Sequence, residues 1–145
     1  MPTFLEQAIA IALQAHQGQT DKTGEPYILH PLRLMLRLSS NAERIVAVLH
    51  DVVEDTPITL DDLRQYGFSE EILAAVDLLT HRPEESYESY VARLTKNPLA
   101  RRVKLADLHD NMDLRRFPTE PLPKDWERMA RYQRAWMVLQ AGHDS

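Results

Sequence analysis

Apolar residues recur at intervals of three and four along most of the chain, and no segment alternates strictly as a half-buried strand would. The first run follows Thr3 and Glu6, which predict a capping box and a helix over residues 4–16. Two glycines and a proline within residues 18–27 predict a loop. Pro31 suits the first turn of a short helix, with His30 at its start, that runs to about residue 38.

Start and stop signals divide the rest of the chain into further helices. Asn41 predicts the cap of a helix that continues through Val53 and stops before Pro57, because the residue before a proline is pushed out of the helical region. Five more helices are predicted: between Thr59 and Gly67, after Ser69, over residues 87–94, from Pro98 to about Leu114, and over about 125–141. The pattern therefore predicts a single all-α domain over residues 1–145.

Composition narrows the chemistry. The 145 residues are 43% hydrophobic, which is enough for one compact core, and they include no cysteine. Disulfides, thiolate catalysis and cysteine-based zinc sites are thereby excluded, so any metal must be held by His, Asp and Glu. The formal net charge of −5 argues against nucleic acid as a partner. No apolar segment is long enough to span a bilayer, and Glu6 stands where a secretory signal carries basic residues, so we expect a soluble, cytoplasmic protein.

The stretch VLHDVVEDT, residues 48–56, places a histidine and three acids beside an apolar helical face. On one helix His50 and Glu54 lie four residues apart, as do Asp51 and Asp55, so the four groups share one neighbourhood. Acids this close repel one another and raise each other's pKa unless a cation offsets their charge. A divalent metal would do so.

Two further candidates for ligands lie elsewhere in the chain. His30 follows the loop, and Asp107 stands within the apolar periodicity of VKLADLHDN, where a carboxylate is otherwise hard to explain. A mixture of imidazole nitrogen and carboxylate oxygen suits Mn, Fe, Zn or Co better than Ca or Mg, and ligand type alone does not choose among the four.

The ordered set of His30, the pair His50-Asp51, and Asp107 resembles the HD superfamily of metal-dependent phosphohydrolases. The strings AHQGQTDKTGEPYILHP, LHDVVEDT and VKLADLHDNMD are similar to the alarmone hydrolase domain of RelA/SpoT-type enzymes and their small single-domain relatives. The resemblance covers about residues 5–115 and implies an HD-type helical bundle.

The resemblance also implies roles for residues. Four would hold one metal, usually manganese in this family: His30, His50, Asp51 and Asp107. Glu54 and Asp55 would position and deprotonate the attacking water, Asn111 would contact the ribose, and Lys22 would face the base or a phosphate. The implied reaction is the release of pyrophosphate from the 3′ position of guanosine tetraphosphate or pentaphosphate, (p)ppGpp.

Three positions depart from the family pattern and leave the substrate open. Asp21 stands beside Lys22 where a basic residue is usual, His81 replaces a common lysine, and Asp113 follows Met112 where arginine is usual. Two alternatives therefore remain beside the (p)ppGpp hydrolase: a phosphohydrolase acting on another nucleotide or phosphate ester, and a non-catalytic nucleotide-binding module. The sequence does not set the oligomeric state.

Other charged residues near the last motif are interpreted as part of the surface. Asp110 and Asp113 either line the mouth of the pocket or are solvated acids. The basic residues of this region are interpreted mostly as a solvated helix face: Arg101, Arg102, Lys104, Arg115 and Arg116.

Overall fold

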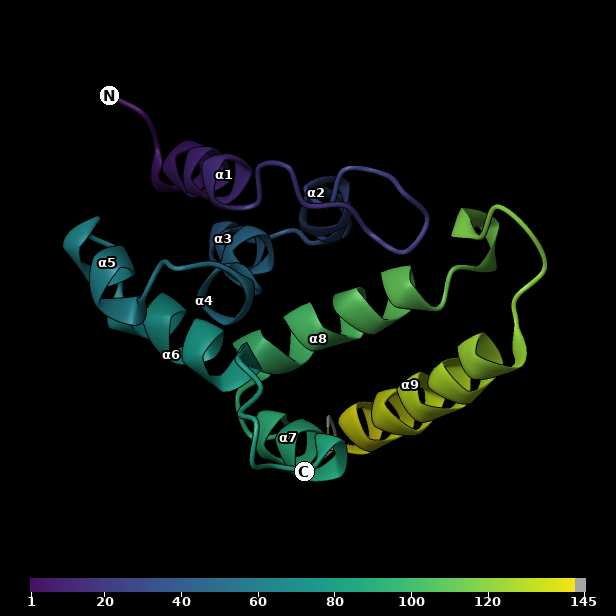
Figure 1. Ribbon diagram of the computed structural model, residues 1–145. Coiled ribbons are helices and arrows are strands. Elements are labelled where there is room, and N and C mark those ends of the chain that lie inside the picture. The colour runs from purple at the N-terminus through teal and green to yellow at the C-terminus, as the bar shows by residue number, and fades with distance from the viewer. Residues whose placement is uncertain (143–145) are drawn as a thin grey trace.

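The computed structural model describes residues 1–142, and over that range its regular structure is helical apart from one isolated β-bridge between Thr20 and Pro26. The predicted all-α class is thus confirmed. The helices are α1 (Phe4–Ala15), α2 (Leu29–Arg37), α3 (Asn41–Leu49), α4 (Val52–Asp55), α5 (Leu60–Gln65), α6 (Glu70–Leu79), α7 (Tyr87–Leu94), α8 (Pro98–Asn111), the short 3₁₀ helix η1 (Leu114–Arg116) and α9 (Pro123–Ala141) (Figure 1).

Helix α8 lies at the centre of the molecule. It packs against α2 and α3 on one side and against α6, α7 and α9 on the other, as Figure 1 shows. Its middle is buried, with Val103 and Leu108 fully enclosed. Side chains of α8 can therefore meet those of the neighbouring α7 and those of α2 and α3, which are far away in the sequence.

Capping signals placed most helices correctly. Thr3 and Glu6 form the predicted capping box of α1, Thr59 and Asp62 form that of α5, and Ser69 caps α6. Each side chain satisfies a backbone N–H that lacks a partner in the first helical turn, so the signal is local and can be read from a few residues.

The helix predicted from Asn41 through Val53 is wrong at both ends. Ser40 is the cap, through a capping box with Glu43, and α3 ends at Leu49. The chain turns at His50 and Asp51 before α4 begins at Val52. At this turn the His50 ring bonds the carbonyl of Ala47 at 2.6 Å, a side-chain bond that competes with continued helix.

Other boundaries also differ from the prediction. Helix α2 begins at Leu29, so His30 lies inside its first turn. Helix α8 ends at Asn111, three residues earlier than predicted, and the Asp113 side chain then caps η1. Helix α9 starts at Pro123. The part of the chain that the structure describes has no helix that is both long and apolar enough to cross a membrane.

Candidate active site

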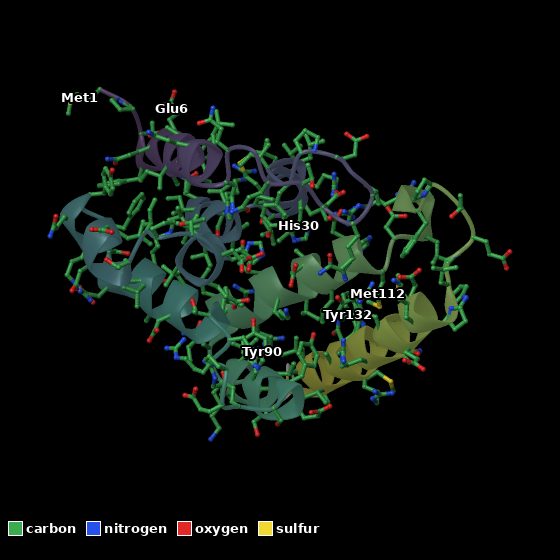
Figure 2. All side chains as sticks on the ribbon, in the orientation of Figure 1. Met1, Glu6, His30, Tyr90, Met112 and Tyr132 are labelled. Atoms are coloured by element: carbon green, nitrogen blue, oxygen red, sulfur yellow. The ribbon has the colours of Figure 1, made fainter. Side chains whose placement is uncertain are left out.

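His30 reaches from α2 toward α8 and connects two acids there. Its Nδ1 lies 2.6 Å from Asp110 Oδ2 and its Nε2 lies 2.8 Å from Asp107 Oδ1. A carboxylate can only accept, so in this arrangement both ring nitrogens carry protons: Nδ1–H donates to Asp110 and Nε2–H donates to Asp107. Burial lowers the pKa of His30, but the two carboxylates outweigh it and raise the pKa overall. Figure 2 shows His30 in the interior, between α2 and α8.

His50 presents the same ring atom from the end of α3. Its Nδ1 donates to the Ala47 carbonyl, and its Nε2 lies 3.1 Å from Asp51 Oδ2 and 3.7 Å from Asp107 Oδ1. That Nε2 is buried and makes no hydrogen bond within the described chain. Burial lowers the pKa of His50, whereas Asp51 and Asp107 raise it well above the ordinary value.

Asp107 and Asp51, the two acids beside these histidines, have different donor groups as partners. Asp107 is 6% exposed; burial raises its pKa, but Lys104, His30 and His50 bring it well below the ordinary value. Asp51 accepts a hydrogen bond from the Tyr27 hydroxyl. Burial also raises the pKa of Asp51, but His50 and Tyr27 bring it down to about 2. Both acids are therefore carboxylates at neutral pH.

These groups fit a divalent metal. One ligand atom from each of His30, His50 and Asp107 lies within 4.8 Å of the other two, and Asp51 lies beside His50. The second ring nitrogen of each histidine is already bonded, which is the usual way that proteins orient metal-binding imidazoles. The unpartnered Nε2 of His50 would gain a partner, and the cation would replace the Nε2 proton of His30.

Glu54 and Asp55 stand next to this centre on α4. With Asp51 they form a second acidic group whose ligand atoms lie within 4.8 Å of one another. Glu54 Oε1 accepts from the backbone N–H of His81 at 2.7 Å, and the Gln19 side chain donates to the Asp55 carbonyl at 3.2 Å. Partial burial and then the neighbouring acids raise the pKa of Glu54, and burial and Asp51 raise that of Asp55. A carboxylate of raised pKa is suited to accept a proton.

The sequence interpretation did not assign Asp110 a place beside the metal centre. It is fully buried, not solvated at the mouth of the pocket. Arg33 binds it through two nitrogens, at 2.8 and 3.0 Å, and Arg116 Nη1 lies 3.0 Å from its Oδ2. Its role is to accept the His30 Nδ1–H. Helical spacing could have suggested it, because Asp110 follows Asp107 by three residues on the same face.

Every predicted site residue except His50 lines one cavity of about 570 Å³. His30, Asp51, Glu54, Asp55 and Asp107 form its floor, while Lys22 and Asn111 line it from the loop and from α8. The Asn111 amide donates to Asp107 Oδ1 at 3.1 Å. Further lining residues that the sequence did not single out include Tyr27, Phe117, Arg128, Met129 and Tyr132.

Asp21 is neutralised within the protein. It accepts hydrogen bonds from Thr23 and the Glu25 N–H, and its Oδ2 lies 3.0 Å from Arg116 Nη2. It therefore shapes the turn in which Gly24 has φ +88°. Arg116, expected on a solvated face, joins this turn to Asp110 and lines the cavity.

Two cations remain near the open end of the cavity. Lys22 and Arg128 both line the cavity, and burial and then the Arg128 guanidinium lower the pKa of Lys22. Arg128 also pairs with Asp125 at 3.2 Å. Asp113, at the same end, accepts from Arg115, whose side chain is largely exposed.

No family model matches the sequence. The bifunctional (p)ppGpp synthase/hydrolase SpoT of Escherichia coli K12 is 34% identical over 122 residues, which cover 74% of this chain and 17% of that protein. The guanosine-3′,5′-bis(diphosphate) 3′-pyrophosphohydrolase of Aquifex aeolicus is 32% identical over 120 residues, with the same coverage. A GTP pyrophosphokinase of Streptomyces coelicolor is 33% identical, covering 78% of this chain and 15% of the relative. The chain thus spans about one sixth of the length of these relatives.

A solved structure supports the fold independently. A metazoan ortholog of SpoT, described as hydrolysing ppGpp, superimposes with a TM-score of 0.73 at 22% sequence identity, over 98% of this chain and 86% of that one. At this identity the match shows the fold, which is the helical bundle that the motifs implied. The chain is therefore similar in sequence to one segment of SpoT-type proteins and similar in fold to a SpoT ortholog, as its motifs predicted.

Proposed function

We propose that this protein is a metal-dependent phosphohydrolase that releases pyrophosphate from the 3′ position of (p)ppGpp. The observation that carries the proposal is the meeting of His30, His50 and Asp107 within 4.8 Å of one another, at a cavity that His30, Asp107, Glu54 and Asp55 line. The names of several similar proteins, which include guanosine-3′,5′-bis(diphosphate) 3′-pyrophosphohydrolases, support the substrate.

His30, His50, Asp51 and Asp107 would hold the cation, for which we propose manganese. When bound, a divalent metal makes water more acidic and offsets charge on phosphoryl oxygens. Glu54 and Asp55 accept the proton of the attacking water, because their carboxylates lie at the edge of the same floor and have raised pKa values. The backbone N–H of His81 keeps the Glu54 carboxylate at that edge.

Substrate binding is assigned to the open end of the cavity. Lys22 and Arg128 place two positive charges near each other, so a phosphate group between them would relieve their repulsion. Asn111, one helical turn after Asp107, lies between this end and the metal centre and would contact the ribose. The nucleotide would then extend from the two cations to the catalytic floor.

Turnover of a nucleotide panel tests the proposal. Purified protein with Mn²⁺ should convert guanosine tetraphosphate into equal amounts of pyrophosphate and GDP, because cleavage occurs at the 3′ oxygen. Release of single phosphates would place the attacked phosphorus elsewhere. The same assay after chelation of the metal is the control and should show no product.

One observation favours a second candidate, hydrolysis of another nucleotide or phosphate ester. Arg116 lines the cavity but is committed to Asp21 and Asp110, so it contributes little free positive charge for a substrate with many phosphates. If guanosine tetraphosphate is inert and a less charged nucleotide or ester is hydrolysed, this candidate replaces the first.

The proposal treats residues 1–145 as one phosphohydrolase domain. We further propose that the protein acts in the cytoplasm, where its nucleotide substrate is found. Its partner is then a small molecule and not a nucleic acid.

A further inference from the structure

Lys104 is a buried cation that the reaction outlined above does not use. It was expected on a solvated face, yet it is only 8% exposed. Its Nζ lies 2.8 Å from Asp107 Oδ2, one helical turn away on α8. With 2.8 Å between nitrogen and oxygen, the two groups form an ion pair, so an ammonium lies beside a proposed metal ligand.

Two tyrosines of α7 enclose this ammonium. Nζ lies 5.1 Å from the ring centre of Tyr90 and 5.7 Å from that of Tyr87, within the range of cation–π contacts. Tyr90 is itself fixed, because its hydroxyl donates to the Leu79 carbonyl at 2.7 Å. Figure 2 shows Tyr90 between α7 and α8. The rings leave the ammonium little freedom to move away from Asp107.

The contacts of Asp107 are divided between its two oxygens. Oδ1 faces the cavity, where it meets His30 Nε2 at 2.8 Å and the Asn111 amide at 3.1 Å. Oδ2 meets Lys104. Oδ1 can therefore exchange its hydrogen-bond partners for a cation, whereas Oδ2 is held by the Lys104 ammonium.

Stability alone does not explain a lysine at this position. Burying an ion pair costs about as much desolvation energy as the attraction returns, so such pairs are weak contributors to folding. An orienting role does explain it, because partners behind metal ligands fix ligand geometry and are worth about 10–100-fold in metal affinity or activity.

We propose that Lys104 is a positioning residue of the metal centre: its ammonium holds Oδ2 of Asp107 so that Oδ1 alone is presented to the cation beside His30 and His50. The inference rests on the proposed metal site and is independent of which phosphate compound is hydrolysed.

The absence of cysteine from the chain allows a matched test. The single thiol of Lys104→Cys can be alkylated in the unfolded protein with either an aminoethyl or a propyl group, and the protein then refolded. The two side chains have nearly the same size and differ in the terminal ammonium. Wild-type protein taken through the same steps is the control, and circular dichroism verifies refolding.

The Mn²⁺ dissociation constant, measured without nucleotide by the paramagnetic resonance of free Mn²⁺, is the main result. The aminoethyl protein should match the wild type, and the propyl protein should bind Mn²⁺ about 10–100-fold more weakly. Lys104→Met, made without chemical modification, should behave like the propyl protein. Tyr87→Phe, which keeps the ring, should leave the affinity unchanged.

Equal Mn²⁺ affinity in the propyl and aminoethyl proteins would overturn the proposal, even if the propyl protein melted at a lower temperature, because only a structural role would then remain. Tighter binding by the propyl protein would also overturn it, since the ammonium would then act by repelling the metal. If the apolar side chains prevent folding, Lys104→Gln, which keeps a donor but no charge, must bind Mn²⁺ more weakly than the wild type for the proposal to survive. If wild-type protein binds Mn²⁺ but does not hydrolyse (p)ppGpp, that result counts against the proposed substrate and leaves the role of Lys104 intact.

Discussion

The floor and the open end of the cavity are built in different ways. Three of the proposed metal ligands, His30, His50 and Asp107, are 3–6% exposed, and each has a protein partner behind the atom that faces the metal centre. At the open end Lys22 is exposed, and Arg128 pairs with a neighbour on its own helix. The proposed metal centre is therefore built on packed helices, whereas the proposed substrate-binding residues lie on an exposed loop and one helix face.

The largest expected effect comes from removing a ligand in the floor. Asp107→Asn should reduce turnover by about a thousandfold or more, because the site would lose the cation that brings the pKa of water from about 15.7 toward 7. Mn²⁺ binding and turnover should disappear together in titration and product assays. Turnover by a variant that binds no metal would show that the proposed metal centre is not needed for the chemistry.

Replacing the proposed bases should keep the metal and slow the reaction. Glu54→Gln and Asp55→Asn should each lower kcat by about two orders of magnitude, the usual contribution of general acid–base catalysis. Mn²⁺ affinity, followed in the same preparations, should stay near that of the wild type. Near-normal kcat in both variants would remove these residues from the mechanism.

Asp110→Asn tests whether the buried partners behind the floor matter. The amide cannot accept the His30 Nδ1–H and the Arg33 contacts as the carboxylate does, so Mn²⁺ affinity should fall by about 10–100-fold. Asp113→Asn is the matched control from the open end, since its main partner is the exposed Arg115. The same loss in both variants would contradict the contrast between the two regions.

At the open end, a smaller effect on binding is expected. Lys22→Ala should raise KM about tenfold, near 1.4 kcal/mol, and leave kcat nearly unchanged, because a contact remote from the reacting phosphorus is made equally in the ground and transition states. Lys96→Ala, an exposed lysine that does not line the cavity, serves as control. A fall in kcat with constant KM would assign Lys22 to the chemistry.

The smallest effect is expected at Glu85, which lies in the same segment as His81, the residue whose N–H holds Glu54. Arg93, and then the Arg82 N–H, hold the pKa of Glu85 at about 2, below the ordinary 4.5. A carboxylate with a depressed pKa stabilises the folded state above pH 4.5, and this contribution disappears as the pH falls through about 2. Glu85→Gln should therefore melt slightly below the wild type near neutral pH and at the same temperature near pH 2. A melting difference that does not depend on pH, or one shared by Glu84→Gln, would argue against the pairing.

Much of the fold was accessible from short-range signals. The caps at Thr3, Thr59 and Ser69 and the segment Tyr87–Leu94 were placed correctly, because capping and amphipathic spacing act within a few residues. The turn at His50 and Asp51 was missed, since a functional ring that bonds its own helix breaks a sequence that is otherwise favourable for helix.

By itself, the sequence determined the all-α class and identified candidate residues whose side chains are able to bind a metal or accept a proton, because residue type and helical spacing are properties of the chain. Only the tertiary structure decided the partners of those residues. Asp110 and Lys104 were expected at the surface, and the packing of α8 against α2 and α7 buried both beside His30 and Asp107. Lys104 and Asp110 each lie one helical turn from Asp107, so helical spacing alone places them nearby. Their burial, and the contact of Asp110 with His30, arise between helices that are far apart in the chain, so no local pattern could assign them.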